Sequence, residues 1–194
     1  GAARGPAMTP RALIDACALY PPLVRGALLS CAAEGLLVPL WSARLLEEWA
    51  LAARRDHGPE GERAVRAEIA AMTARWPGAE TPPPAAPPPF DLPDPDDVHV
   101  LAGALAGGAD WLVTFNLRDF PAPKLRALGV APVSPDAALW ELAGRSPEAA
   151  ARALARALGP FPALSGDARE TAKALKRAHL PRFAKLVRSG ALAP

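Results

Sequence analysis

Short apolar runs, separated by stretches of helical periodicity, constrain the fold of this chain most strongly. The runs cover residues 11–15, 36–40, 111–114 and 129–133. Each is too short for a typical helix and long enough for a buried strand. Strands that alternate with helices form a parallel sheet with helices on both of its faces. The sequence therefore predicts an α/β fold.

Helix start and stop signals place the elements between these runs. A helix is expected over residues 21–34, with proline at its start and Gly35 at its end. Ser42 is a suitable N-cap for a second helix that ends near Gly58, and a third is expected over residues 60–76. Further helices are expected at about residues 97–106, 124–128, 135–143, 147–158, 167–179 and 181–189.

The chain has 194 residues, which suits one domain with a small appendage. We assign residues 8–134 to the main domain and residues 135–194 to a helical, basic extension. The proline-rich stretch 77–96 is interpreted as a stiff connection within the main domain, because both of its flanks contribute to one polar cluster. The net charge of +2 excludes a strong overall field for nucleic acid. The basic faces of the extension suit either an amphipathic helical cap or a gripping surface for RNA or a protein.

Acidic and amide side chains follow the expected strands. Asp15 ends the first run, and Asn116 and Asp119 come just after residues 111–114. Asp97 heads the helix that precedes this strand, and Glu48 lies in the second turn of its helix. In a parallel sheet with right-handed crossovers, the carboxyl ends of the strands lie at one edge. We therefore expect the carboxylates of Asp15, Glu48 and Asp97 to converge there.

Carboxylates gathered in this way need a proton or a cation. Two unit charges about 4 Å apart repel by roughly 4 kcal/mol at an effective dielectric near 20. The candidate ligands are all oxygen atoms, with no paired His or Cys, which favours Mg²⁺ or Mn²⁺ over Zn²⁺. Such an ion supports phosphoryl chemistry by activating water. Taken singly, Asp15 and Asp97 also suit a turn and a helix cap, and Glu48 suits a solvated helix face.

Three segments together give a more specific signal than any single acid. Residues 12–19 hold a strand that ends in Asp, residues 42–49 hold a capped helix with Glu, and residues 94–121 hold the remaining polar side chains. This combination resembles the PIN domain, the fold of VapC-type toxin ribonucleases, over roughly residues 10–135. The resemblance implies a three-layer α/β/α fold with a short parallel sheet, followed here by the helical extension. It also implies a catalytic metal site formed by Asp15, Glu48, Asp97, Asn116 and Asp119.

The chain departs from the family pattern at several positions. The family often has Thr-Asn after the first Asp, where this chain has Ala16 and Cys17. Two glutamates are adjacent, and we choose Glu48 over Glu47 as the ligand, because it lies six residues after Ser42. Asn116 stands where an Asp is common, which lowers the charge of the site.

The resemblance implies a metal-dependent endoribonuclease in which water attacks an RNA phosphodiester in line. It further implies the toxin of a type II toxin–antitoxin pair, with an antitoxin protein as partner and a homodimer formed by helices 21–35 and 42–57. A phosphatase with an aspartyl nucleophile is disfavoured, because Cys17 occupies the position of its usual second Asp. A non-catalytic PIN-fold module that binds RNA or protein is the other alternative.

The remaining residues support simpler interpretations. Cys17 and Cys31 lie in apolar surroundings as free thiols, which suits a reducing cytoplasm. No apolar run is long enough to span a membrane. His99 is assigned to the surface or to a supporting position beside the site. The tryptophans at positions 41, 49, 111 and 140 are expected in the core.

Overall fold

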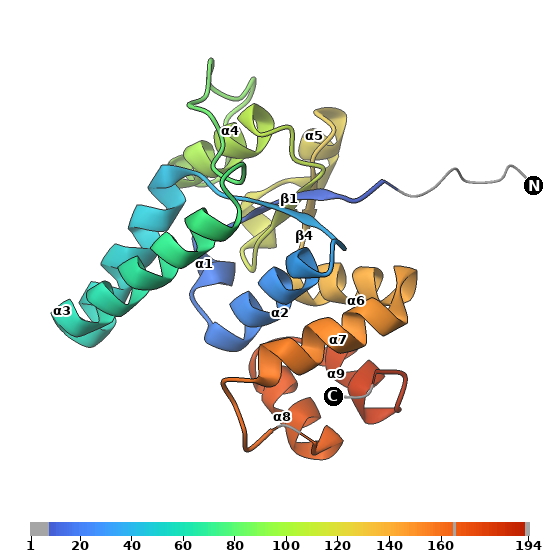
Figure 1. Cartoon of the computed structure of the whole chain (residues 1–194). Coiled ribbons are helices and arrows are strands. Elements are labelled where there is room, and N and C mark those ends of the chain that lie inside the picture. The colour runs from blue at the N-terminus through green and yellow to red at the C-terminus, as the bar shows by residue number, and fades with distance from the viewer. Residues whose placement is uncertain (1–7, 165, 193–194) are drawn as a thin grey trace, which may run out of the picture.

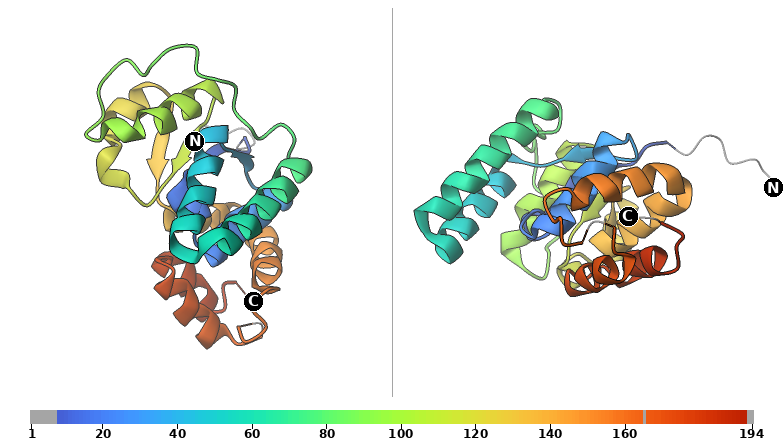
Figure 2. Two further views of the ribbon diagram at one scale, coloured as in Figure 1. Left: turned by 90° about the vertical axis from the view of Figure 1, so that its left-hand side faces the viewer. Right: turned by 60° about the horizontal axis from the view of Figure 1, so that its bottom comes forward.

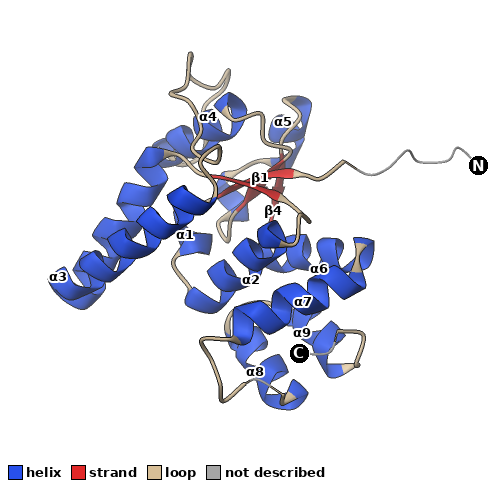
Figure 3. Cartoon of the chain, in the orientation of Figure 1, coloured by secondary structure: helices blue, strands red, loops and turns tan. Residues whose placement is uncertain are grey.

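A short parallel sheet forms the centre of the computed structural model. The structure describes residues 8–164 and 166–192, and in them four strands pair in the order β2-β1-β3-β4 (Figure 3). All three pairings are parallel. The prediction of an α/β fold is confirmed. The strands are β1 (Arg11–Ile14), β2 (Val38–Leu40), β3 (Trp111–Val113) and β4 (Ala131–Val133).

Successive residues of β1 pack on opposite faces of the sheet, as side chains of a strand do. Ala12 and Ile14 belong to one buried cluster, and Leu13 belongs to another. α1 (Ala16–Leu19) and α2 (Pro22–Ala33) cover the first face, whereas α4 (Val98–Ala106) and α5 (Ala122–Ala127) cover the second (Figure 1). The expected three-layer α/β/α arrangement is therefore present.

α3 (Ala43–Arg75) consists of two helical arms joined at Gly58. Gly58 has φ 70° and ψ −167°, which only glycine adopts easily, and Pro59 begins the second arm. This turn lies where the sequence predicts one helix to end and another to begin. Although α3 is the longest helix, no helix in residues 8–164 and 166–192 is long and apolar enough to cross a membrane.

The proline-rich stretch 77–96 begins as an extension of the sheet. The Thr81 amide donates to the Trp41 carbonyl at 2.8 Å, and the Trp41 amide donates to the Ala79 carbonyl at 3.0 Å. The stretch then arches over α4, as the left view of Figure 2 shows. It connects α3 to α4 and thereby brings the acids of residues 94–97 to the sheet.

Among the described residues after β4, four helices continue one of the buried clusters. α7 packs along α2, α8 and α9 pack on each other, and α9 also packs on α6. Phe183 in α9 is 1 % exposed and belongs to the same cluster as Ile14. The Asp136 carboxylate, itself buried, accepts from the backbone amides of Arg182 and Phe183 at 3.1 and 3.0 Å. The helices are α6 (Pro135–Arg145), α7 (Pro147–Leu158), α8 (Ala168–Arg177) and α9 (Pro181–Arg188).

Two expectations about surfaces change with this packing. Trp140 was expected in the core, but it is 44 % exposed, because Ala138, Leu139 and Leu142 form the buried face of α6. The guanidinium of Arg182 lies over the Trp140 ring at 4.0 Å. In addition, α7 covers apolar residues of α2, which was expected to form part of a dimer interface. The division of the chain at residue 134 stays a prediction.

Candidate metal centre

Asp15 lies at the carboxyl edge of the sheet, directly after β1. Its backbone amide donates to the Val113 carbonyl at 3.0 Å, which fixes it beside the end of β3. The Asp15 side chain is buried, and its Oδ2 accepts from the Thr114 hydroxyl at 2.7 Å and from the Cys17 thiol at 3.2 Å. Within the part of the chain that the structure describes, Oδ1 accepts no hydrogen bond. Asp15 therefore has one oxygen oriented by the protein and one free to bind a cation.

The Cys17 thiol helps to orient the Asp15 carboxylate. Burial, followed by the charge of Asp15, raises the pKa of the Cys17 thiol to about 12. The thiol therefore stays protonated and donates to Asp15. Ala16 and Cys17, which stand where the family often has Thr-Asn, offer neither a hydroxyl nor an amide side chain to orient Asp15. The orienting groups are instead the Cys17 thiol and the Thr114 hydroxyl, which comes from a different strand.

Three further acids meet beside this position. Asp94, Asp97 and Asp119 each offer an oxygen, and these atoms lie within 4.8 Å of one another. Asp97 precedes α4, and its side chain makes no capping hydrogen bond. Its Oδ2 instead accepts from the Asn116 side-chain amide at 3.1 Å. The helix-cap interpretation of Asp97 therefore does not hold.

Asp94 is the acid that sequence reasoning missed. It lies three residues before Asp97, and the 3₁₀ turn at Pro95–Asp97 brings side chains with this spacing onto one side. The spacing of the two acids was the available signal. One Asp94 oxygen also accepts from the Asp96 amide at 2.9 Å, which orients the carboxylate.

The charges of the surrounding acids act on the Asp97 carboxylate. Its pKa is raised to about 6, first by burial and then by the charges of Asp15, Asp94, Asp119 and Glu48. Asp15 and Glu48 are not in the 4.8 Å group within the described residues, but their charges act on Asp97. Excess negative charge around one half-buried carboxylate is what a divalent cation relieves. The donors are carboxylate and amide oxygens, which fit Mg²⁺ or Mn²⁺.

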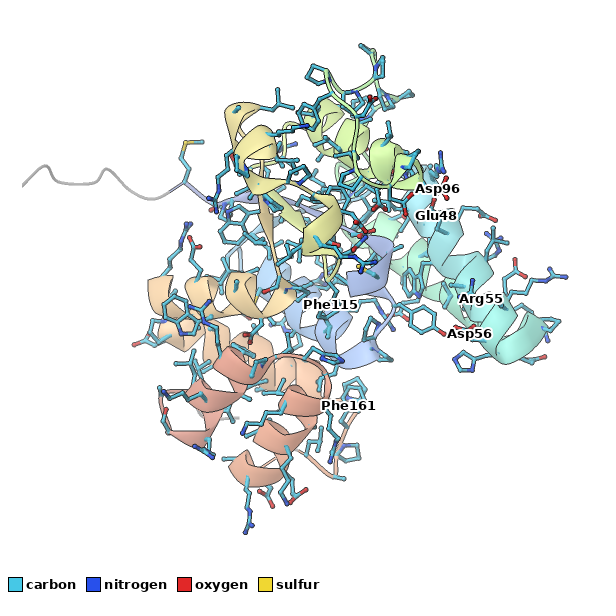
Figure 4. All side chains as sticks on the ribbon, turned by 180° about the vertical axis from the view of Figure 1, so that it is seen from behind. Glu48, Arg55, Asp56, Asp96, Phe115 and Phe161 are labelled. Atoms are coloured by element: carbon cyan, nitrogen blue, oxygen red, sulfur yellow. The ribbon has the colours of Figure 1, made fainter. Side chains whose placement is uncertain are left out.

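The two adjacent glutamates of α3 point to different partners. Glu48 Oε1 lies 2.9 Å from His99 Nε2 and accepts from Arg44 Nε at 3.1 Å. Glu47 instead forms a two-pronged ion pair with Arg66 in the second arm of α3, at 2.8 and 2.9 Å. The charge of Glu48 acts on Asp97, and Figure 4 labels Glu48 on the first arm of α3. The choice of Glu48 over Glu47 fits this arrangement, and His99 supports Glu48 from α4.

Asp97 thus lies in the 4.8 Å group with Asp94 and Asp119 and contacts Asn116, and the charges of Asp15 and Glu48 act on it. The sequence profile of one protein family, described as the PIN domain, matches residues 11–118, which is more than half of the 194-residue chain. Among the six polar residues, only Asp119 lies beyond the matched span, by one residue. No curated protein and no solved structure matched the chain.

Proposed function

We propose, since this chain belongs to the PIN-domain family, that it is a metal-dependent endoribonuclease that hydrolyses RNA phosphodiester bonds. The observation that carries the proposal is the set of acids around Asp97. Three of them offer oxygens within 4.8 Å, and the pKa of Asp97 is raised to about 6. A structural role explains neither the missing cap nor the accumulated charge.

In this proposal each polar residue has a stated task. The Thr114 hydroxyl and the Cys17 thiol hold one oxygen of Asp15, and the other would be available to bind the ion. His99 and Arg44 hold the Glu48 carboxylate at the rim. The bound ion would activate water and stabilise the charge that develops on the phosphate. The proposed ligands of Mg²⁺ or Mn²⁺ are Asp15, Glu48, Asp97, Asn116 and Asp119, with Asp94 beside them.

The biological role rests on the resemblance to toxin ribonucleases. We propose that the protein acts in the cytoplasm as the toxin of a type II pair and is neutralised by an antitoxin protein. A neighbouring reading frame that encodes a small DNA-binding protein would support this role. Neighbouring genes with no such product would count against it. The proposed homodimer needs a surface other than the apolar face of α2 that α7 covers. Leu51 on α3, 50 % exposed, is one apolar side chain that such a surface could use.

Glu48→Gln and Glu47→Gln form a matched pair that separates a nuclease from a non-catalytic binding module. Glu48→Gln should weaken Mn²⁺ binding by at least about tenfold and lower RNA cleavage with it, because a charged ligand is lost. Glu47→Gln breaks only an exposed ion pair with Arg66, so both properties should stay near wild type. Calorimetric Mn²⁺ titration and gel-based RNA cleavage provide the readouts.

Equal effects of the two substitutions would contradict the assignment of Glu48. A non-catalytic module would bind RNA without Mn²⁺-dependent cleavage in the wild type and in both variants.

A further inference from the structure

A cavity of about 440 Å³ opens next to the acidic cluster, between α1 and the first arm of α3. Glu48 and Cys17 belong to both the cavity and the site, since Cys17 contacts Asp15. Glu48, Arg55 and Asp56 follow one another along α3 in Figure 4. The cavity is therefore adjacent to the proposed metal site. Its other walls include Tyr20, Trp49 and Ala52.

The floor of the cavity is formed by a buried side chain that is packed on its other side. Trp49 is 1 % exposed, and the Arg25 guanidinium lies 4.6 Å from the centre of its ring. Arg25 is itself fixed by a two-pronged pair with Glu68, at 2.6 and 2.8 Å. The small side chains of Ala16 and Ala52 leave the space above this floor open.

Tyr20 provides an aromatic wall in a fixed orientation. Its hydroxyl donates to Asp56 Oδ2 at 2.6 Å and lies 3.3 Å from His57 Nε2. These contacts anchor the ring at its polar end. In proteins that bind single-stranded nucleic acid, aromatic rings beside a binding groove are platforms on which unpaired bases stack.

Arg55 provides a cation at the far end of the cavity. Its side chain is 74 % exposed, and its Nε donates to Asp56 Oδ1 at 3.1 Å. Its terminal nitrogens make no hydrogen bond with the described residues. Arg55 follows Glu48 by seven residues, about 10 Å along the helix. This spacing suits contact with a phosphate that neighbours the scissile phosphate at the proposed metal site.

We propose that this cavity binds the base of a nucleotide adjacent to the scissile phosphate in single-stranded RNA. The Tyr20 ring stacks on the base, and Arg55 contacts a neighbouring phosphate. The phosphate itself stays outside the cavity, because the carboxylates of Glu48 and Asp56 line it. Only an unpaired base can enter the cavity. This inference rests on the proposed nuclease function and adds a base-binding subsite to it.

The test measures binding of a labelled single-stranded RNA hexamer, and of the matching duplex, by fluorescence anisotropy in EDTA. Ala52→Leu fills the cavity and should weaken hexamer binding by about tenfold or more, the scale of one lost base stack. Ala74→Leu, at an exposed position in the second arm of α3, should leave binding unchanged. Tyr20→Ala should weaken binding to a similar extent, whereas Tyr20→Phe keeps the ring and most of the affinity.

Arg55→Gln should lower the slope of log affinity against log salt by about 1, the change expected for one lost phosphate contact. Arg54→Gln is its control, because Arg54 is the neighbouring arginine and pairs with Glu62. In cleavage assays with Mn²⁺, the cavity variants should raise KM more than they lower kcat.

Two results would overturn the inference. One is unchanged hexamer binding in Ala52→Leu and Tyr20→Ala, as expected if the cavity instead receives a side chain of a partner protein. The other is an equal loss of hexamer and duplex binding. Either result leaves the nuclease proposal intact if wild type still cleaves RNA with Mn²⁺. A wild type that never cleaves RNA would instead refute the proposed function.

Discussion

Replacing Asp97 with Asn should lower RNA cleavage by at least about a hundredfold, the scale of losing one strong transition-state contact. The substitution removes the carboxylate on which the charges of the surrounding acids act. The metal-free protein should meanwhile stay as stable as wild type or become more stable. Asp97 makes no capping hydrogen bond, and its loss of charge relieves repulsion from Asp15, Asp94, Asp119 and Glu48.

The pH dependence of stability provides a second test of the charge around Asp97. The pKa of Asp97 is about 6 in the folded protein and near its ordinary value of 3.8 in the unfolded chain. Between these values the folded state holds more protons than the unfolded state, so stability should fall as pH rises from about 4 to about 6. Asp97→Asn should lose this component of the slope. Thermal unfolding in EDTA across that pH range measures it.

Near-normal cleavage by Asp97→Asn would contradict the metal-binding role. A large loss of stability at pH 7 in EDTA would instead show that the Asp97 carboxylate holds the fold together, against the geometry described above.

Replacing Phe183 with Ala should lower the free energy of unfolding by roughly 3–5 kcal/mol, the usual cost of deleting a buried aromatic ring. Phe183 is 1 % exposed and lies in the cluster that includes residues of the sheet. For a chain of this size the midpoint should fall by roughly 6–20 °C. Trp140→Ala is the matched control, because Trp140 is large but 44 % exposed, and its ring lies under the Arg182 guanidinium. It should cost about 1 kcal/mol or less.

Differential scanning calorimetry of the two variants decides whether the C-terminal helices share the core of the main domain. A single transition that moves as a whole in Phe183→Ala is expected. Two transitions, of which only one moves, would show that residues 135–194 fold separately.

The strands and the acids at their ends could be predicted because both depend on local patterns. Short apolar runs are read directly as strands, and the topology of a parallel sheet then brings Asp15 and Asn116 to one edge. The helix of Glu48 could be placed from its cap at Ser42, whose hydroxyl accepts from the Leu45 amide at 3.2 Å. In this part of the chain, local preference and tertiary structure agree.

The contacts that sequence reasoning missed join segments far apart in the chain. Thr114 orients Asp15 across 99 residues, and α7 covers α2. Trp140 was expected to be buried because large aromatic residues usually are, but the neighbours of α6 determine which of its faces points inward. Asp94 was missed because an Asp at the start of a helical turn usually serves only as a cap, and Asp94 does accept a capping hydrogen bond from the Asp96 amide. None of these contacts follows from periodicity.

The most direct test of a metal-dependent nuclease is cleavage of a single-stranded RNA by one preparation in three conditions. The protein is assayed as purified, after EDTA treatment and after Mn²⁺ is restored, with Asp97→Asn carried through the same steps. We expect cleavage by wild type to disappear with EDTA and to return with Mn²⁺, while the variant stays at least about a hundredfold slower than wild type once Mn²⁺ is restored. Cleavage that persists in EDTA, or that Asp97→Asn performs at the wild-type rate, would contradict the assignment of the acids around Asp97 to a catalytic metal site.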